Sequence, residues 1–275
     1  MSAETIEIVA SNLTLDIPIY DPRARSFRHA MLRPIANTLR GATYIGGNIQ
    51  KSNGVVVVRA IDNVSFRIDH GERVGIIGHN GAGKTTLLRA MAGIFEPTGG
   101  SMMTCGQIMP LFNLMEGLMP ESTGREFIRI RGVLLGLEPR QIDPLIDEVA
   151  EFCELGDYID MPVRTYSTGM LVRVAFAVAT SVTSDILLFD ELIGAGDARF
   201  LKKGEERLRR FAQRSSIVVI ATHNHDILLK WCTRALLLDH GSLIHDGDVA
   251  STLRLHDARL TATTEPAEEP QPADA

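Results

Sequence analysis

The chain has 275 residues, of which 45% are hydrophobic and 23% charged, and 28 basic against 34 acidic residues give a net charge of −6. This composition is that of an ordinary globular protein of one or two domains. The acidic balance and the lack of a strong basic cluster argue against nucleic acid as a partner.

The cysteines Cys105, Cys153 and Cys232 lie far apart and form no C-x-x-C pair, which argues against a disulfide framework or a structural zinc site. A reducing cytoplasm is therefore the expected compartment. No uninterrupted apolar stretch approaches the length of a bilayer span, and the first ten residues carry acids where a signal peptide needs positive charge. We expect a chain that does not itself cross a membrane.

The first third of the chain is predicted to be mainly strand. Residues 5–20 alternate apolar and polar side chains, which predicts one or two strands. Residues 21–53 place basic side chains beside apolar ones at roughly helical spacing, so we predict an inserted, partly helical arm. Strand character resumes in GVVVVRAIDNVSFRID, and RVGIIG is a short buried strand that leads into a glycine loop and the helix KTTLLRAMAGIF.

The middle third is predicted to be helical. Thr123 and Glu126 fit a capping box, and PRQIDPLIDEVAEFCELG has amphipathic helical spacing. Strands return in DILLFD, SIVVIAT and ALLLD, separated by helical patterns. Strands that alternate with helices predict a parallel sheet and an α/β fold. Residues 259–275 are rich in proline and acid, which predicts a disordered tail.

The stretch GHNGAGKT fits the phosphate-binding loop (P-loop) pattern G-x-x-x-x-G-K-[ST] and lies between a predicted strand and a predicted helix. Its glycines allow successive backbone N–H groups to face a phosphate, and the helix dipole adds positive potential there. Lys84 is predicted to reach the outer phosphates and the Thr85 hydroxyl to ligate Mg²⁺. The residues predicted to bind the nucleotide here are Gly78, His79, Asn80, Gly81, Ala82, Gly83, Lys84, Thr85 and Thr86.

Two later strands supply further candidates. The strand DILLFD delivers Asp190 to its carboxyl end, where it would ligate Mg²⁺, and Glu191 follows as a carboxylate that can orient an attacking water. The strand in SIVVIAT ends before His223, whose imidazole could reach the γ-phosphate or that water. The alternatives are a strand with an acidic cap and a surface histidine.

The order of P-loop, YSTGM, DILLFDE, GAGD and ATH resembles that of the ATP-binding cassette (ABC) proteins over residues 5–258. YSTGM, AGD and PESTGREF further resemble the nucleotide-binding subunits of polysaccharide exporters, which move lipid-linked O-antigen, capsule or teichoic-acid chains. The resemblance implies a P-loop NTPase of the ABC type within residues 1–258. Its parts would be a RecA-like α/β core, an antiparallel β subdomain and a helical signature subdomain over about 122–180.

The resemblance also implies that two copies sandwich ATP. Ser167 and Gly169 in YSTGM would then contact the γ-phosphate bound to the P-loop of the other copy, and Asp197 in GAGD would link the two sites. The alternatives are an N-cap at Ser167 and a turn carboxylate at Asp197. The motif departs from the commonest cassette signature at Tyr166, Thr168 and Met170.

Two positions stay open. No glutamine stands where a typical Q-loop supplies one, because Gln107 comes too early, so Asn113 or Glu116 is the substitute. The aromatic ring that stacks on adenine is predicted to be Tyr20, and the alternatives are a buried structural role for Tyr20 or stacking by Tyr44.

Two apolar or basic segments are candidates for membrane-side contacts. The loop GQIMPLFNLMEGLMPEST is rich in methionine and leucine, and it either fills the core or receives a short helix of a membrane partner. The arm at 21–53 lies near anionic headgroups, near the cytoplasmic mouth of the transporter, or on the solvated surface.

The sequence therefore predicts an ATPase that uses ATP and Mg²⁺, acts as a homodimer, and drives export through separate polytopic transmembrane permease subunits. Its cargo would be lipid-linked polysaccharide, and it would lie peripherally on the cytoplasmic face of the inner membrane. The alternatives are an ATPase subunit for another ABC cargo, a soluble ABC ATPase not coupled to transport, and a non-catalytic nucleotide sensor.

Overall fold

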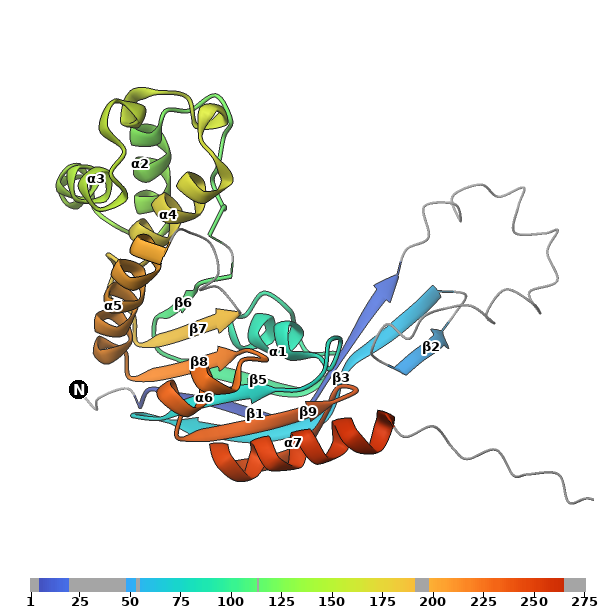
Figure 1. The fold of residues 1–275 in the computed structure, drawn as a ribbon. Coiled ribbons are helices and arrows are strands. Elements are labelled where there is room, and N and C mark those ends of the chain that lie inside the picture. Colours follow the sequence, from blue (N-terminus) through green and yellow to red (C-terminus); the bar gives the residue numbers. More distant parts are fainter. Residues whose placement is uncertain (1–4, 20–47, 53–54, 113, 191–197, 265–275) are drawn as a thin grey trace, which may run out of the picture.

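The computed structural model describes residues 5–19, 48–52, 55–112, 114–190 and 198–264. Within these residues the strands form two sheets, drawn in Figure 1. The smaller sheet is antiparallel and has the order β2-β3-β1-β5. Its strands are β1 (Glu7–Ile19), β2 (Asn48–Ser52), β3 (Val55–Asp69) and β5 (Gly99–Cys105).

The larger sheet has the order β10-β9-β4-β8-β7-β6, and only β10 among these described strands runs antiparallel to its neighbour. Ala221 at the end of β8 pairs with Ile76 of β4 on one side and with Asp190 of β7 on the other. The carboxyl ends of these three strands therefore meet at one edge. The strands are β4 (Arg73–Ile77), β6 (Ile108–Pro110), β7 (Ile186–Asp190), β8 (Ile217–Ala221), β9 (Arg234–Asp239) and β10 (Ser242–Asp248).

Helices cover both faces of the larger sheet (Figure 1). Helix α1 (Lys84–Met91) lies between the two sheets, where its buried residues share a core with β1, β3 and one face of the parallel strands. Helices α5 (Ala198–Arg214), α6 (His225–Trp231) and α7 (Val249–Thr264) contribute to the core on the other face.

The apolar runs of the parallel strands explain the two cores. In β8, Ile217 and Val219 belong to the α1 side, whereas Val218 and Ile220 belong to the side of α5 and α6. Successive side chains of a strand point to opposite faces, so a strand buried on both faces needs an uninterrupted apolar run. The predicted parallel α/β architecture is confirmed.

A helical subdomain projects from the sheets at the top of Figure 1. It contains α2 (Gly124–Leu134), α3 (Pro139–Cys153) and α4 (Thr168–Ala179), with short 3₁₀ turns at Gly156–Asp160 and Val163–Thr165. The predicted capping box is confirmed. The Thr123 hydroxyl accepts from the Glu126 amide at 3.2 Å, and the Glu126 carboxylate accepts from the Thr123 amide at 2.8 Å.

Two sequence expectations need correction. Residues 48–52 of the predicted helical arm form β2, which pairs with β3 and so satisfies backbone groups that an edge strand would leave open. Residues 20–47 lie outside the described residues. The disordered tail predicted from residue 259 is wrong for 259–264, because α7 continues to Thr264 and Arg259 of this helix pairs with Asp239. Residues 265–275 lie outside the described part.

The methionine-rich loop fills the core at three of its apolar positions. Met109, Leu111 and Leu114 are buried beside residues of α2 and β7, whereas Met119 is 58% exposed. Phe112, Met115 and Leu118 are partly buried and pack against the core, so core filling, the alternative weighed against a docking surface, accounts for most of this loop.

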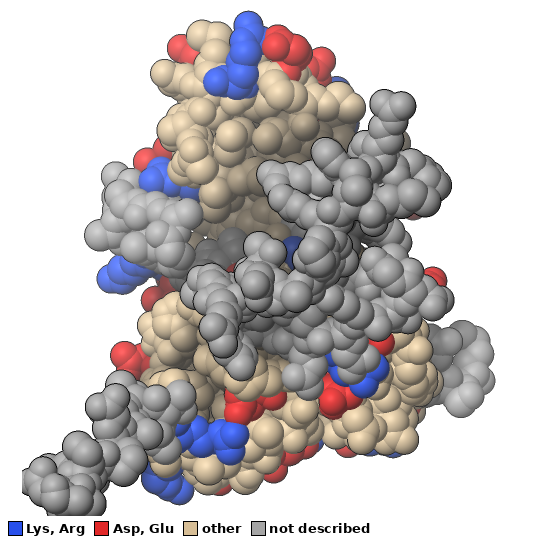
Figure 2. Space-filling view, turned by 90° about the vertical axis from the view of Figure 1, so that its right-hand side faces the viewer, with Lys and Arg blue, Asp and Glu red and all other residues tan. Residues whose placement is uncertain are grey.

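The described residues on the face drawn in Figure 2 include charges of both signs. Its described Lys and Arg side chains lie in separate small groups, several of them beside Asp or Glu, and form no continuous basic patch. None of the described helices has the length and hydropathy needed to cross a bilayer.

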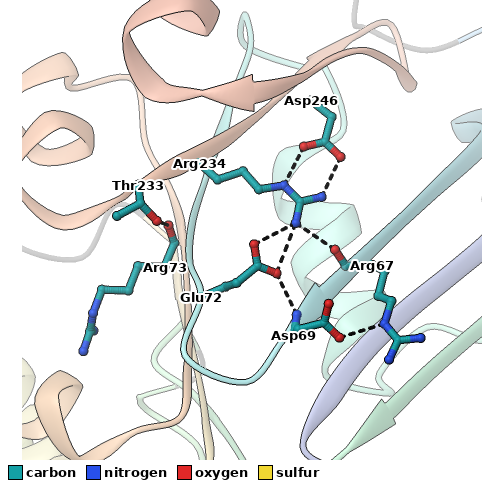
Figure 3. A network of polar contacts seen from close by, with 7 residues as sticks. All are labelled: Arg67, Asp69, Glu72, Arg73, Thr233, Arg234 and Asp246. Atoms are coloured by element: carbon teal, nitrogen blue, oxygen red, sulfur yellow. Dashed lines mark hydrogen bonds and ion pairs between the residues drawn. The ribbon is translucent and has the colours of Figure 1, made fainter.

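Arg234 on β9 holds the two sheets together at the amino-terminal end of β4 (Figure 3). Its guanidinium donates to both carboxylate oxygens of Asp246 at 2.6 and 2.7 Å, to both oxygens of Glu72 at 2.9 and 3.1 Å, and to the Arg67 carbonyl of β3 at 2.9 Å. The hydrogen bonds to Asp246 raise the pKa of Arg234, burial opposes the rise, and Glu72 adds to it. The network thus joins β3, the turn before β4, β9 and β10.

We predict that Arg234→Ala lowers the free energy of unfolding by about 2 kcal/mol, because Glu72 and Asp246 are left as half-buried carboxylates without their shared donor. Urea denaturation followed by circular dichroism measures this change. Arg254→Ala, at an exposed position of α7, is the control and should change stability little. Equal stability of the two variants would contradict the role given to this network.

Candidate nucleotide-binding site

The loop between β4 and α1 needs glycine at two positions because the backbone packs against two other strands. A Cβ on Gly78 would lie 2.3 Å from the carbonyl oxygen of Leu238 on β9, and one on Gly83 would lie 2.7 Å from that of Ala60 on β3. Gly83, the N-cap of α1, also has a φ of 106°, which favours glycine. The backbones of β9 and β3 therefore leave no room for a side chain at these two positions of the loop.

Lys84 is folded back over this loop. Its ammonium donates to the carbonyl oxygens of Gly78 at 2.7 Å and His79 at 3.0 Å. Burial lowers the pKa of Lys84, and the nearby charge of Asp190 opposes that shift. A cation that has lost part of its hydration gains from an added anion, so this position suits a phosphate oxygen.

Thr85 and Asp190 meet although they are far apart in the sequence. Thr85 in the first turn of α1 donates its hydroxyl to the Asp190 carboxylate at the end of β7, with 2.6 Å between the oxygens. A hydroxyl and a carboxylate are the hard oxygen ligands that Mg²⁺ prefers. The donor set therefore fits a magnesium ion beside a phosphate.

A cavity of about 310 Å³ opens over the loop. Ile17 and Val58, which are cross-strand partners on β1 and β3, form an aliphatic wall beside the polar loop. Sequence reasoning missed both, because no motif distinguishes them from other alternating strand residues. The lining residues are Ile17, Val58, Ala60, Asn80, Gly81, Gly83, Lys84, Thr85, Thr86 and Asp190.

The remaining loop residues of the predicted set shape the cavity without lining it. Ala82 is fully buried, and its carbonyl accepts from the Gly241 amide at 3.0 Å in the β9–β10 turn. His79 turns toward the same region, with its imidazole Nε2 3.2 Å from the Asp239 carboxylate. Contacts with β9 and with the turn that follows it thus hold the loop in place.

His223 follows the strand that lies between the P-loop strand and the Asp190 strand. The Thr222 amide donates to the Ile76 carbonyl at 3.3 Å, and the Thr222 hydroxyl accepts from the Asn224 amide at 3.0 Å. These bonds fix the backbone on both sides of His223, whose side chain is exposed. Strand order places His223 at the edge shared with the loop and Asp190, and its catalytic role stays a prediction.

The signature residues lie in the helical subdomain and do not line the cavity. Ser167 is exposed and caps α4, with its hydroxyl accepting from the Met170 amide at 3.1 Å. The N-cap alternative is therefore realised, and Gly169 follows in the first turn of the same helix. One copy of the chain does not bring Ser167 into its own cavity.

Tyr166 anchors this motif. It is buried, its hydroxyl donates to the Tyr158 carbonyl at 2.5 Å, and burial raises its pKa to about 12. A Cβ on Gly124 would lie 2.1 Å from the Tyr166 hydroxyl oxygen. Tyrosine at this position therefore fixes the loop before Ser167 against the start of α2.

Gln107 and Glu116, both considered for the Q-loop position, lie among the described residues. Gln107 bonds through its backbone to Asp185, at the end of β7 remote from Asp190, which agrees with its early place in the sequence. Glu116 has its carboxylate 3.7 Å from Arg131, and its role as a Q-loop substitute stays open. The candidates outside the described residues are Tyr20, Tyr44, Asn113, Glu191 and Asp197.

Comparisons with known proteins give a consistent result. The family model described as "ABC transporter" matches residues 61–194. The chain is 42% identical over 240 residues to the O-antigen export system ATP-binding protein RfbE of Yersinia enterocolitica, covering 87% of this chain and 97% of that protein. It is 36% identical over 263 residues to the protein of the same description, RfbB, of Myxococcus xanthus, covering 92% of this chain and 60% of that one.

Solved structures agree with the fold. A dimeric ATP-binding cassette in a post-hydrolysis state, bound to ADP and phosphate, superposes with a TM-score of 0.63. The match has 18% identity and covers 88% of this chain and 98% of that one. The likeness confirms the predicted cassette architecture.

We predict that Gly83→Ala weakens ATP binding at least about tenfold, because the added Cβ strikes the Ala60 carbonyl and shifts the loop. Isothermal titration with ATP measures the change. Gly71→Ala is the matched control, since Gly71 also has a positive φ, 90°, but open space around its Cβ. If both variants bind ATP as well as the unaltered chain, the close approach does not shape the site.

Proposed function

The chain belongs to the ABC transporter family, and we propose that it is the ATP-hydrolysing subunit of an exporter that translocates lipid-linked polysaccharide of the O-antigen or capsule type. The observation that carries this proposal is its 42% identity across 97% of an O-antigen export ATP-binding protein. The packed P-loop with Lys84, Thr85 and Asp190 converging on one cavity supports ATP as the substrate.

The described residues divide the work of binding ATP. Backbone amides of the P-loop and the amino-terminal end of α1 would face the phosphates, and the Lys84 ammonium would exchange its carbonyl partners for the outer phosphate oxygens. Thr85 and Asp190 would hold Mg²⁺, which neutralises charge that develops on the transferred phosphoryl group. Ile17 and Val58 offer an apolar wall on which a base can rest.

Hydrolysis needs a group that orients water in line with the γ-phosphate. Glu191 directly follows Asp190, so its carboxylate is the candidate for this role, and His223 at the end of β8 is the candidate for contact with the γ-phosphate. These two roles rest on strand order and residue chemistry.

We infer that the active form is a head-to-tail homodimer. The cavity of one copy is lined by β1, β3, the P-loop, α1 and β7, without a residue of the helical subdomain. Ser167 and Gly169, at the amino-terminal end of α4, would complete the site of the partner copy, where the helix end favours an anion. Asp197 would link the two sites.

The exporter also needs membrane-spanning subunits, because translocation requires a path through the bilayer and no described helix provides one. We propose that separate polytopic permease subunits supply this path, and that the chain lies on the cytoplasmic face of the inner membrane through contact with them. An ABC ATPase for a different cargo is the second candidate. It would share the hydrolytic site and differ in the permease it serves.

We predict that Glu191→Gln binds ATP but turns it over at least about a hundredfold more slowly, because the amide cannot accept a proton from water. ATP should then trap a dimer, visible by size-exclusion chromatography with light scattering, whereas ADP should leave the chain monomeric. Phosphate release at the unaltered rate, or no ATP-dependent dimer, would contradict the roles of Glu191 and of the shared site.

We also predict that a strain lacking this gene regains surface polysaccharide with the unaltered chain but not with Lys84→Ala, which lacks the ammonium needed at the phosphates. Immunoblots of surface and cytoplasmic lipid-linked glycan measure the outcome. Gly71→Ala is the control that should restore export. Unchanged surface glycan in the deletion strain would favour the second candidate, another cargo.

A further inference from the structure

A cluster of two histidines and one aspartate lies behind the P-loop. His79 comes from the P-loop, Asp239 ends β9, and His240 follows in the β9–β10 turn. Their imidazole nitrogens and a carboxylate oxygen all lie within 4.8 Å of one another. The Asp239 Oδ1 atom is 3.2 Å from His79 Nε2 and 3.7 Å from His240 Nε2.

The hydrogen bond on the other side of the His79 ring fixes its tautomer. His79 Nδ1 lies 2.8 Å from the Asn80 carbonyl oxygen, which can only accept, so Nδ1 carries the proton. In the neutral ring, Nε2 therefore presents its lone pair toward Asp239. This nitrogen is inaccessible to solvent and makes no hydrogen bond, although a carboxylate oxygen is near.

A neutral imidazole lone pair is repelled by the carboxylate that it faces, whereas a metal cation held between the two would be attracted to both. An imidazole held through Nδ1–H to a backbone carbonyl, with Nε2 directed at other ligands, is the arrangement by which proteins orient metal-binding histidines. Separations of 3.2 and 3.7 Å bracket the distance of about 3.4 Å expected between two ligand atoms of a tetrahedral zinc ion.

We propose that His79, Asp239 and His240 form a binding site for a divalent transition-metal ion of the zinc class, distinct from the magnesium position at Thr85 and Asp190. Two imidazoles and one carboxylate select zinc over magnesium, which prefers oxygen ligands. His240 is 54% exposed, so solvent can supply a fourth ligand.

A contact with α7 orients the Asp239 carboxylate toward the two imidazoles. Asp239 Oδ2 accepts from Arg259 of α7 at 2.5 Å, which leaves Oδ1 directed at the two imidazoles. Arg259 thus orients the carboxylate and balances part of its charge, while Oδ1 stays available to a bound ion.

An ion at this position would stabilise the backbone of the P-loop. His79 does not line the nucleotide cavity, whereas its carbonyl and that of Gly78 hold Lys84. A bound ion would tie the back of the P-loop to the end of β9 and its turn, where the Gly241 amide already donates to the Ala82 carbonyl. The site thus braces the backbone that carries Lys84.

Zinc titration of the untagged, nucleotide-free chain in excess Mg²⁺ tests this proposal. We expect one tightly bound Zn²⁺ per chain by isothermal titration and a rise in melting temperature on its addition. Both His79→Ala and His240→Asn should weaken Zn²⁺ binding at least about tenfold. Asparagine is chosen at 240 because the backbone there has a φ of 46°, which asparagine tolerates.

His225→Ala is the matched control, since His225, His256 and Asp257 form a second histidine and aspartate cluster between α6 and α7. It should bind Zn²⁺ like the unaltered chain, and circular dichroism verifies the fold of each variant. The proposal would be overturned if no Zn²⁺ bound, if His79→Ala and His240→Asn bound Zn²⁺ as tightly as the unaltered chain, or if His225→Ala lost binding. Co²⁺ can replace Zn²⁺ as a spectroscopic probe. Thiolate charge-transfer bands in its absorption spectrum would also overturn the proposal, because they would place the metal on a cysteine.

Discussion

The structure depends on the close approach of one loop to the backbones of two strands. The P-loop has β3 on one side and β9 on the other, and the carbonyl groups of Ala60 and Leu238 leave no room for a Cβ at Gly83 and Gly78. This contact fixes where α1 begins, and hence where Lys84 and Thr85 lie. Loss of the approach would separate the cation and the hydroxyl from Asp190, which is carried by a different strand.

The strand order of the parallel sheet brings the other candidate residues to the same edge as the P-loop. Because β4, β8 and β7 are neighbours in register, the P-loop, the segment after Ala221 and Asp190 leave the sheet together. The signature motif is held apart from this edge on the helical subdomain, where buried Tyr166 and the N-cap at Ser167 fix it. Because Ser167 does not line the cavity of its own copy, this separation supports the proposal that a second copy completes the site.

Much of this arrangement could be predicted from the sequence, and the failures have physical causes. The P-loop, the buried parallel strands and the capping box at Thr123 depend on local patterns of glycine, apolar runs and capping residues. The strand at 48–52 was missed because β2 is polar and forms by pairing with the edge of β3. The extent of α7 was missed because the pairing of Arg259 with Asp239 crosses between distant segments.

By itself, the sequence determined the P-loop, its lysine and the alternation of strands and helices, because each is encoded by neighbours along the chain, and the order of its motifs implied the cassette fold by resemblance. Only the tertiary structure decided that Ile17 and Val58 wall the cavity, that Arg234 joins the two sheets, and that His79, Asp239 and His240 converge. These groups come from strands and turns that are remote in sequence. Their proximity follows from strand order and register, which no local pattern of residues specifies.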